Sequence, residues 1–332
     1  MYILEEQRLK EEIRSRKAKR VLLQFPDGLK PLSTEVVRRL GELLPEVEFL
    51  TSGEPSFGSC DIAEDEARLL NVDLIVHFGH TPYTWYYPKF PTLFVDAKST
   101  LTVTPEELNE LRTAIRRREA RTISLTSTVQ HSDVLKEVAN YLRSEYEVKI
   151  GKPSNPFMYD GQVWGCDYKA ATTVNADVYI NVSGGEFHSL GLGLATGKPT
   201  LNLDPYTGTV KDVTEEVWKV LKVRYSKMYK AMEGTTWVVI QGLKVGQNRP
   251  LMVKYLVSSL EKRGMRTFTF TSKYLTKESI RNFDRSYIDA YVVTSCPRLP
   301  TDDFYDFEKP VLTPGEAKMI ITGKMEPYIF PW

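Results

Sequence analysis

The sequence predicts an α/β protein of three similar α/β domains with mainly parallel sheets, arranged around a central site. A pattern of buried strand, polar loop and amphipathic helix begins three times, near Lys19, Arg121 and Thr235. Further strands follow each time, and strands alternating with helices favour parallel sheets. The three cysteines are also widely spaced, and each follows a predicted strand. We therefore expect one cysteine-bearing loop in each domain.

The first domain is predicted over residues 1–118. A helical, charged segment opens the chain, and the strand that begins at Lys19 leads through a Pro/Gly loop into an amphipathic helix. Cys60 precedes a short helical segment, and the remaining strands are expected at 47–53, 72–80 and 92–98. A helix from Pro105, with proline at N1, connects this domain to the next.

The second domain, 119–233, repeats this plan from Arg121. Cys166 again precedes a helical segment, and the later strands are expected at 147–153, 176–185 and 199–206. A helix with Asp212 as its N-cap candidate ends at Gly234 and leads into the third domain.

The third domain, 234–332, differs in one respect. Its later strands are expected at 266–272, 288–296 and 310–316, so that Cys296 follows the third strand and not the second. Loops at the carboxyl ends of parallel strands are where open α/β sheets bind ligands. All three cysteines are expected in such loops, facing one cavity.

Composition limits the class of protein. The chain has 332 residues, 42% hydrophobic and 26% charged, which is enough for two or three domains with a sizeable core. The 44 basic and 43 acidic side chains give a net charge of +1, so we expect neither nucleic acid nor a membrane as a partner. No apolar stretch resembles a signal peptide or a membrane span, and three cysteines without such a signal favour a reducing cytoplasm.

The cysteines allow more than one chemistry. A lone cysteine is most often a buried small hydrophobe. Three thiolates at one point would be an odd number for disulfides and one short of a closed four-thiolate metal site. They would suit an iron–sulfur cluster with one iron open to substrate. A zinc site of Cys₃His type is the alternative, and it would need His80 or His188 to approach.

The other strand-end loops hold polar candidates. Gly184 and Gly185 would let a ligand approach the backbone, although a tight turn explains them equally well. Arg298 could pair with a ligand carboxylate, or with an aspartate of its own loop at Asp302 or Asp303. The glycine patterns match neither a dinucleotide loop nor a nucleoside-triphosphate loop.

Three more side chains could hydrogen-bond a ligand or lie in solvent. They are Gln241, Lys244 and Gln247, in the loop after the first strand of the third domain. The aromatic run that begins at Trp85 is consistent with a partner surface or with packing against the core.

Eight segments together carry a family resemblance: QFPDGL, GSCD, VHFGHTPY, GQVWGCD, GGEFHSLGL, LKVGQ, VTSCPR followed by DD, and PVLTPGE. In this set the chain resembles the diphthamide-synthesis radical enzymes in their archaeal, self-paired form, from about Arg20 to the C-terminus. The CxxxCxxC loop of the common radical enzymes is absent from the sequence.

The resemblance implies a specific cofactor and reaction. Cys60 in FGSCD, Cys166 in WGCD and Cys296 in TSCPR would each bind one iron of a [4Fe-4S] cluster, leaving the fourth iron for S-adenosylmethionine. A 3-amino-3-carboxypropyl radical from S-adenosylmethionine would add to C2 of a histidine imidazole of translation elongation factor 2, the first step of diphthamide biosynthesis. The enzyme would be a homodimer and would need an electron donor.

Some roles stay open at this stage. Arg298, Gln241 and His80 are candidates for holding the methionine moiety of S-adenosylmethionine, and Gly184 and Gly185 for making room for its nucleoside. No residue is assigned a catalytic role. The competing hypotheses are a zinc-dependent α/β enzyme and a non-catalytic partner or scaffold subunit, and the presence of all three cysteines argues against the latter.

Overall fold

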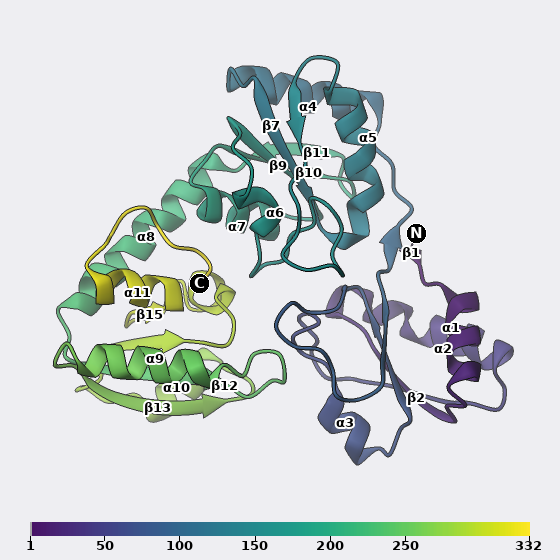
Figure 1. The fold of residues 1–332 in the computed structure, drawn as a ribbon, viewed down its shortest axis with the longest axis horizontal. Coiled ribbons are helices and arrows are strands. Elements are labelled where there is room, and N and C mark those ends of the chain that lie inside the picture. The colour runs from purple at the N-terminus through teal and green to yellow at the C-terminus, as the bar shows by residue number, and fades with distance from the viewer. Residues whose placement is uncertain (1) are drawn as a thin grey trace.

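The computed structural model describes residues 2–332, so that Met1, the first residue of the first predicted domain, lies outside the described residues. Across residues 2–332 the strands form three mainly parallel sheets and one short two-stranded ladder, β1 (Tyr2–Ile3) with β6 (Lys98–Ser99). In Figure 1 each sheet and its helices form a separate body, and the three bodies surround a common centre. We call them the first, second and third units.

The first unit contains a four-stranded parallel sheet in the order β3-β2-β4-β5. Its central strands are almost fully buried apolar runs, as expected of parallel strands covered on both faces. The strands are β2 (Arg20–Gln24), β3 (Glu48–Thr51), β4 (Leu74–Phe78) and β5 (Thr92–Val95), and the helices are α1 (Glu6–Ser15), α2 (Ser33–Leu43) and α3 (Glu64–Leu69).

The second unit has the equivalent order β8-β7-β9-β10, extended by an antiparallel strand β11 that the sequence did not predict. Asp212 is the last residue of that strand, and the following helix has Val213 and not the predicted Asp212 as its N-cap, although Asp212 Oδ1 accepts from Thr214 N at 3.0 Å. The strands are β7 (Thr122–Ser127), β8 (Glu147–Lys149), β9 (Val178–Val182), β10 (Thr200–Asp204) and β11 (Thr209–Asp212), with helices α5 (Ser132–Leu142), α6 (Lys169–Thr172) and α7 (Phe187–Thr196).

The third unit again has the same order, β13-β12-β14-β15, and is fully parallel. Its strands are β12 (Thr236–Gly242), β13 (Arg266–Ser272), β14 (Ala290–Val293) and β15 (Val311–Leu312), and its helices are α9 (Pro250–Glu261), α10 (Lys277–Phe283) and α11 (Pro314–Thr322). The α/β fold with mainly parallel sheets is therefore confirmed, and the repeat extends to strand order.

One aspartate contact recurs in all three units. Asp73, Asp177 and Asp289 each stand directly before the third strand of their unit. Each carboxylate accepts two successive backbone N–H bonds, at 2.7–2.9 Å, where the first strand of its unit begins. These bonds fix the register of the two central strands, and they mark the units as structural repeats.

Two helices connect the units. The helix α4 (Pro105–Arg117) begins with proline at N1 and a Thr104–Glu107 capping box, and its buried leucines and isoleucine lie in the core of the second unit. The helix α8 (Thr214–Met232) places its first half in a cluster with the second unit and its last turn in the core of the third. The boundaries at 118/119 and 233/234 stay predictions.

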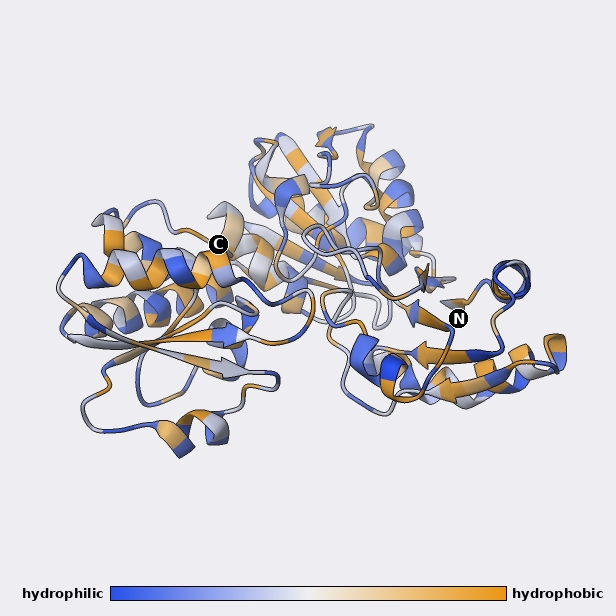
Figure 2. Ribbon diagram, turned by 60° about the horizontal axis from the view of Figure 1, so that its bottom comes forward, coloured by the Kyte–Doolittle hydropathy of each residue, from blue (hydrophilic) through white to orange (hydrophobic). Residues whose placement is uncertain are grey.

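Apolar residues concentrate on the strands and on the inner faces of the helices, as Figure 2 shows by hydropathy. Among residues 2–332 no helix is both long and apolar enough to cross a membrane.

Candidate metal centre

The three cysteines lie in the strand-end loops where the sequence placed them. Cys60 lies between β3 and α3, Cys166 between β8 and α6, and Cys296 after β14, and all three are free, partly buried thiols. Burial raises the pKa of the Cys166 thiol well above its ordinary value, and the nearby Cys60 and Cys296 raise it further. Since thiols from three different units affect one another electrostatically, the fold has brought them into one neighbourhood.

In the metal-free protein, burial favours the neutral form of the three thiols by raising their pKa values. Burial raises the pKa of the Cys60 thiol to about 12, so at neutral pH the metal-free thiol keeps its proton. A bound metal removes that proton, because its charge compensates the thiolate. Among residues 2–332 no three His, Cys, Asp or Glu side chains lie close enough together to enclose one metal ion. Three cysteine thiolates would nevertheless be suitable ligands for a soft metal or an iron–sulfur cluster.

Each sulfur has a hydrogen-bonding partner. Nε2 of Gln247 lies 3.3 Å from Sγ of Cys60, and the hydroxyl of Tyr83 lies 3.8 Å from Sγ of Cys166. Burial raises the pKa of the Cys296 thiol, and hydrogen bonds from backbone N–H groups just beyond it in the same loop oppose that rise. The hydrogen bonds to the sulfur atoms favour the thiolate, but in the metal-free protein burial outweighs them and the pKa of each thiol is raised.

Arg298 combines the two alternatives that the sequence left open. Its Nη2 donates to Asp302 at 2.9 Å, so the ion pair within the loop is present. Its Nε and Nη1 are buried and make no hydrogen bond of normal geometry among residues 2–332, although the Tyr168 hydroxyl lies near the guanidinium. The guanidinium lies 3.8 Å from the centre of the Phe187 ring, and a Cβ on Gly191 would collide with it. Two buried N–H donors are thus left for an anionic ligand.

A hydrogen-bonded chain fixes the protonation of His80. Gln24 Oε1 accepts from Ala63 N at 3.2 Å, so this oxygen also accepts the proton of His77 Nδ1, 2.8 Å away. Burial lowers the pKa of His77 well below its ordinary value, so the ring is neutral and its Nε2 is an acceptor. The Nδ1 of His80, 3.0 Å from that acceptor, must then donate.

The free nitrogen of His80 is consequently an acceptor. Burial lowers the pKa of His80 to about 4, so at neutral pH Nε2 carries a lone pair. Nε2 and the sulfur of Cys60 lie on the same side of Gly58, since a Cβ there would be 4.0 Å from Nε2 and 3.6 Å from Sγ. His188 was expected at an equivalent strand end but lies in the first turn of α7, where burial and the charge of Arg298 lower its pKa to about 3.

The remaining sequence candidates have local partners. Gln241, near the end of β12, donates to Asn248 at 2.7 Å. Gly184 lies so close to the ring of Tyr206 that a Cβ would be 2.8 Å away, and Gly185 has a φ of +64°, which favours glycine. A tight turn accounts for both glycines, and their proposed role toward a nucleoside stays a prediction.

Sequence reasoning missed the side chains around Cys166. Arg249 donates from Nη2 to the Tyr83 hydroxyl at 2.7 Å, and its guanidinium lies 4.3 Å and 3.7 Å from the ring centres of Trp85 and Trp332. Trp332 also donates its Nε1–H to the carbonyl of Cys166 at 3.0 Å. The aromatic run at Trp85, 49% exposed, therefore packs within the molecule on one side. In the sequence, only the number of aromatic residues near Trp85 indicated this packing.

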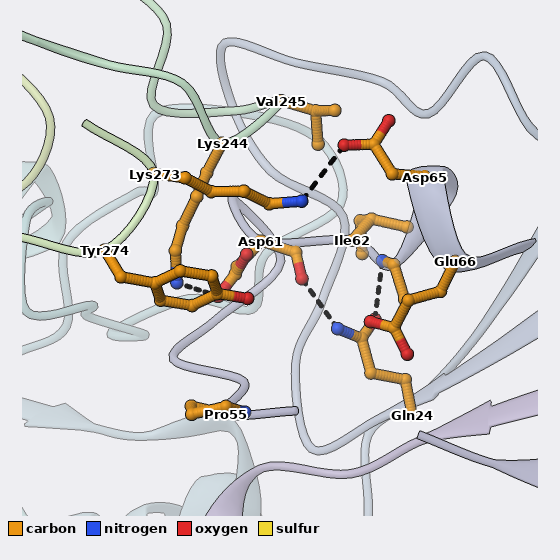
Figure 3. A pocket seen from close by; sticks show the side chains of 11 residues that line it. Gln24, Pro55, Asp61, Ile62, Asp65, Glu66, Lys244, Val245, Lys273 and Tyr274 are labelled. Atoms are coloured by element: carbon orange, nitrogen blue, oxygen red, sulfur yellow. Dashed lines mark hydrogen bonds and ion pairs between the residues drawn. The ribbon is translucent and has the colours of Figure 1, made fainter. Parts of the chain in front are cut away.

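The loop after β12 clamps Cys60 from the third unit. Lys244, which is 5% exposed, forms an ion pair with Asp61, and Gly246 N donates to the carbonyl of Cys60 at 2.9 Å. Figure 3 shows this pair at the junction of the two units, with the exposed pair of Lys273 and Asp65 beside it. Lys244 is therefore buried and binds Asp61, the residue next to Cys60, and does not lie in solvent.

Fold and site together define the class of protein: a three-sheet α/β protein in which each unit carries one cysteine in a strand-end loop. The model of the diphthamide synthesis protein family matches residues 25–329. The chain belongs to this family.

Individual relatives agree. The chain is 35% identical to 2-(3-amino-3-carboxypropyl)histidine synthase of Pyrococcus horikoshii over 94% of its own length and 88% of that protein. It is 24% identical to the synthase of the same name from Methanocaldococcus jannaschii, over 98% and 92% of the two chains. The crystal structure of Dph2 from Pyrococcus horikoshii with a 4Fe-4S cluster matches with a TM-score of 0.86 and 34% identity, over 99% of this chain and 94% of that one.

Proposed function

We propose that this protein transfers a 3-amino-3-carboxypropyl group from S-adenosylmethionine to C2 of a histidine imidazole in translation elongation factor 2, by a [4Fe-4S]-dependent radical mechanism. The observation that carries this proposal is that one loop of the third unit reaches two cysteines of other units, Cys60 directly through Gln247 and Cys166 through Arg249 and Tyr83. It is supported by relatives named as synthases of this modified histidine and by the solved relative that holds a 4Fe-4S cluster.

In this proposal Cys60, Cys166 and Cys296 bind the cluster through their thiolates. The cluster supplies one electron to cleave a carbon–sulfur bond of the sulfonium, and its chemistry belongs to the cofactor and not to the protein. The chain's own residues bind and orient. One sulfur from each unit leaves a cluster iron without a protein ligand, and such an open position is where catalytic metal sites bind substrate.

The amino-acid end of S-adenosylmethionine has matching groups in the site. Its carboxylate suits the two unpaired buried N–H donors of Arg298, since such charge-assisted bonds are the strong ones. Its amino group is a donor and suits the lone pair on Nε2 of His80. Gln241 is a further polar candidate, and Gly184 and Gly185 would lie against the nucleoside.

The proposed partners follow from the reaction. They are elongation factor 2 as protein substrate, an electron donor for the cluster, and a second copy of this chain in a homodimer. We place the reaction in the reducing cytoplasm, where thiolate ligands persist. Neither nucleic acid nor a membrane has a role in it.

The test starts with protein purified or reconstituted without oxygen. We expect about four irons per chain and the visible absorbance of an iron–sulfur protein. Incubation with dithionite, S-adenosylmethionine and elongation factor 2 should then add one aminocarboxypropyl group to a histidine, detected by mass spectrometry. Stoichiometric zinc with no visible absorbance would support the zinc hypothesis instead, and colourless, iron-free protein would refute the proposal.

The ligand assignment has its own control. Cys60→Ala, Cys166→Ala and Cys296→Ala should each lower cluster occupancy or stability. If all three variants kept the full cluster and full transfer activity, the assignment would be wrong.

A further inference from the structure

The cysteine sulfurs receive hydrogen bonds from units other than their own. Gln247 of the third unit reaches Cys60 of the first, with Nε2 and Sγ 3.3 Å apart. Tyr83 of the first unit reaches Cys166 of the second, with the hydroxyl and Sγ 3.8 Å apart. Arg249 of the third unit in turn holds Tyr83. All three units therefore contribute to the surroundings of these two sulfurs.

The direction of these bonds follows from the donors available. A guanidinium has no acceptor, so the Tyr83 oxygen must accept from Nη2 of Arg249, 2.7 Å away. The hydroxyl proton of Tyr83 is then free to point at Cys166. A metal-bound cysteine is a thiolate and can only accept, so Tyr83 donates O–H to one sulfur and Gln247 donates N–H to the other.

Arg249 is held firmly enough to orient the hydroxyl. Its guanidinium lies 4.3 Å and 3.7 Å from the ring centres of Trp85 and Trp332, which pack edge to face against each other. Its Nε is buried and has no hydrogen-bond partner in the described chain, residues 2–332. A partly buried cation that contacts two indoles and donates to this hydroxyl polarises its O–H, which strengthens the bond to sulfur.

We propose that Tyr83 and Gln247 set the reduction potential of the cluster by donating hydrogen bonds to its cysteine sulfurs, with Arg249 as the residue that positions Tyr83. This inference rests on the proposed function. Reduction adds negative charge to a cluster and its ligand sulfurs, and hydrogen bonds to those sulfurs are among the terms that set the potential. Donors stabilise the reduced form, so these residues make the cluster easier to reduce.

The test measures the midpoint potential of the reconstituted protein by a redox titration followed by electron paramagnetic resonance. Tyr83→Phe and Gln247→Leu should each make the potential more negative, by roughly a tenfold change in the reduction equilibrium, which is about 59 mV for one electron. Tyr86→Phe is the matched control, because Tyr86 lies in the same loop but bonds to Glu64. Its potential should equal that of the unmodified protein.

Two further measurements separate tuning from structural damage. Arg249→Met should shift the potential in the same direction as Tyr83→Phe, and adding it to Tyr83→Phe should give less than the sum of the two shifts. Fluorotyrosine at position 83 is a stronger donor and should shift the potential the opposite way. The fluorotyrosine measurement tests the role of Tyr83 even if Tyr83→Phe loses its cluster, and an unchanged potential would count against that role.

The outcomes distinguish this inference from the proposed function. Unchanged potentials in Tyr83→Phe and Gln247→Leu, with a full cluster, would overturn the inference and leave the proposed function standing. Failure of the unmodified protein to bind any cluster would overturn both.

Discussion

Arg224 offers the sharpest test of how the third unit is held to the rest of the molecule. It lies on α8 with no exposed surface and donates to both carboxylate oxygens of Glu316, at 2.7 Å and 2.6 Å. It also donates to the carbonyls of Pro300 and Val311, each at 2.6 Å. Pro300 belongs to the turn that follows Cys296, so one side chain joins the connecting helix, α11 and a cysteine loop.

The cost of Arg224→Met can be estimated from these contacts. Removing one partner of a buried ion pair typically costs about 3–5 kcal/mol, because the other charge stays buried. Glu316 would keep two donors, Thr313 N at 2.8 Å and the Tyr328 hydroxyl at 2.7 Å. These two donors favour the lower end of that range, so we expect Arg224→Met to lower the free energy of unfolding by about 3 kcal/mol. This is a large part of the roughly 5–15 kcal/mol that stabilises a folded domain.

The assay is urea unfolding followed by circular dichroism. The midpoint for Arg224→Met should fall with an unchanged slope, and hydrogen exchange of the Leu299–Asp303 turn should accelerate. Glu316→Gln added to Arg224→Met should recover part of the loss by removing the stranded charge. Arg118→Met, which breaks a one-third-exposed pair with Asp212, should cost less than about 1 kcal/mol. A loss below about 1 kcal/mol for Arg224→Met would refute this reasoning.

Three other predictions use the same kind of comparison. Lys244→Met should lower the free energy of unfolding by about 3 kcal/mol, because it leaves the buried Asp61 unpaired. Lys273→Met breaks an exposed ion pair and should change the free energy of unfolding by less than about 1 kcal/mol. Equal effects of the two substitutions in urea unfolding would contradict this prediction. Gly191→Ala should displace both the Tyr168 hydroxyl and the Arg298 guanidinium, and should weaken S-adenosylmethionine binding at least roughly tenfold by equilibrium titration of the cluster-loaded protein. Unchanged affinity would remove Arg298 from the carboxylate site. Backbone N–H bonds from β7 and from the residue before it lower the pKa of Asp177 to about 2, whereas its pKa in an unfolded chain is about 3.9. The ionised Asp177 therefore stabilises the fold above about pH 4, and this stabilisation is lost as the pH falls towards about 2. The difference in urea midpoint between the unmodified protein and Asp177→Asn should therefore shrink over that range, and a difference that grew would contradict the sign.

The repeated order of strands and helices in the three units could be predicted from the sequence because local residue patterns determine it. Buried strands such as Leu74–Phe78 and Val178–Val182 are mostly apolar, with one polar residue each, and the polar loops between strands contain glycines and prolines. The strand β11 was missed because Thr209–Asp212 has only four residues, with Val210 as its one apolar side chain, and lies at a sheet edge. Without that strand, Asp212 reads as a helix N-cap.

Of the proposed site, only the three cysteines could be selected from the sequence. Cysteine is rare in this chain and chemically distinctive, so Cys60, Cys166 and Cys296 stand out even before any contact is known. The bond between Arg249 and Tyr83 joins residues 166 positions apart, and no local pattern specifies it. Buried polar partners of this kind are fixed by tertiary packing, so the sequence shows the residue types but not the pairs.

The division of the centre among the units has an energetic consequence. Cys60 is held from the third unit by Gln247, and Cys166 is contacted by Tyr83 of the first unit and by Trp332 from the third. No single unit contains a complete site, so a cluster bound by all three cysteines stabilises only the chain in which the units are assembled. Metal-binding free energy then becomes folding free energy. Loading the cluster should raise the unfolding temperature of the whole chain, and the cysteine variant that retains the least iron should show the smallest rise.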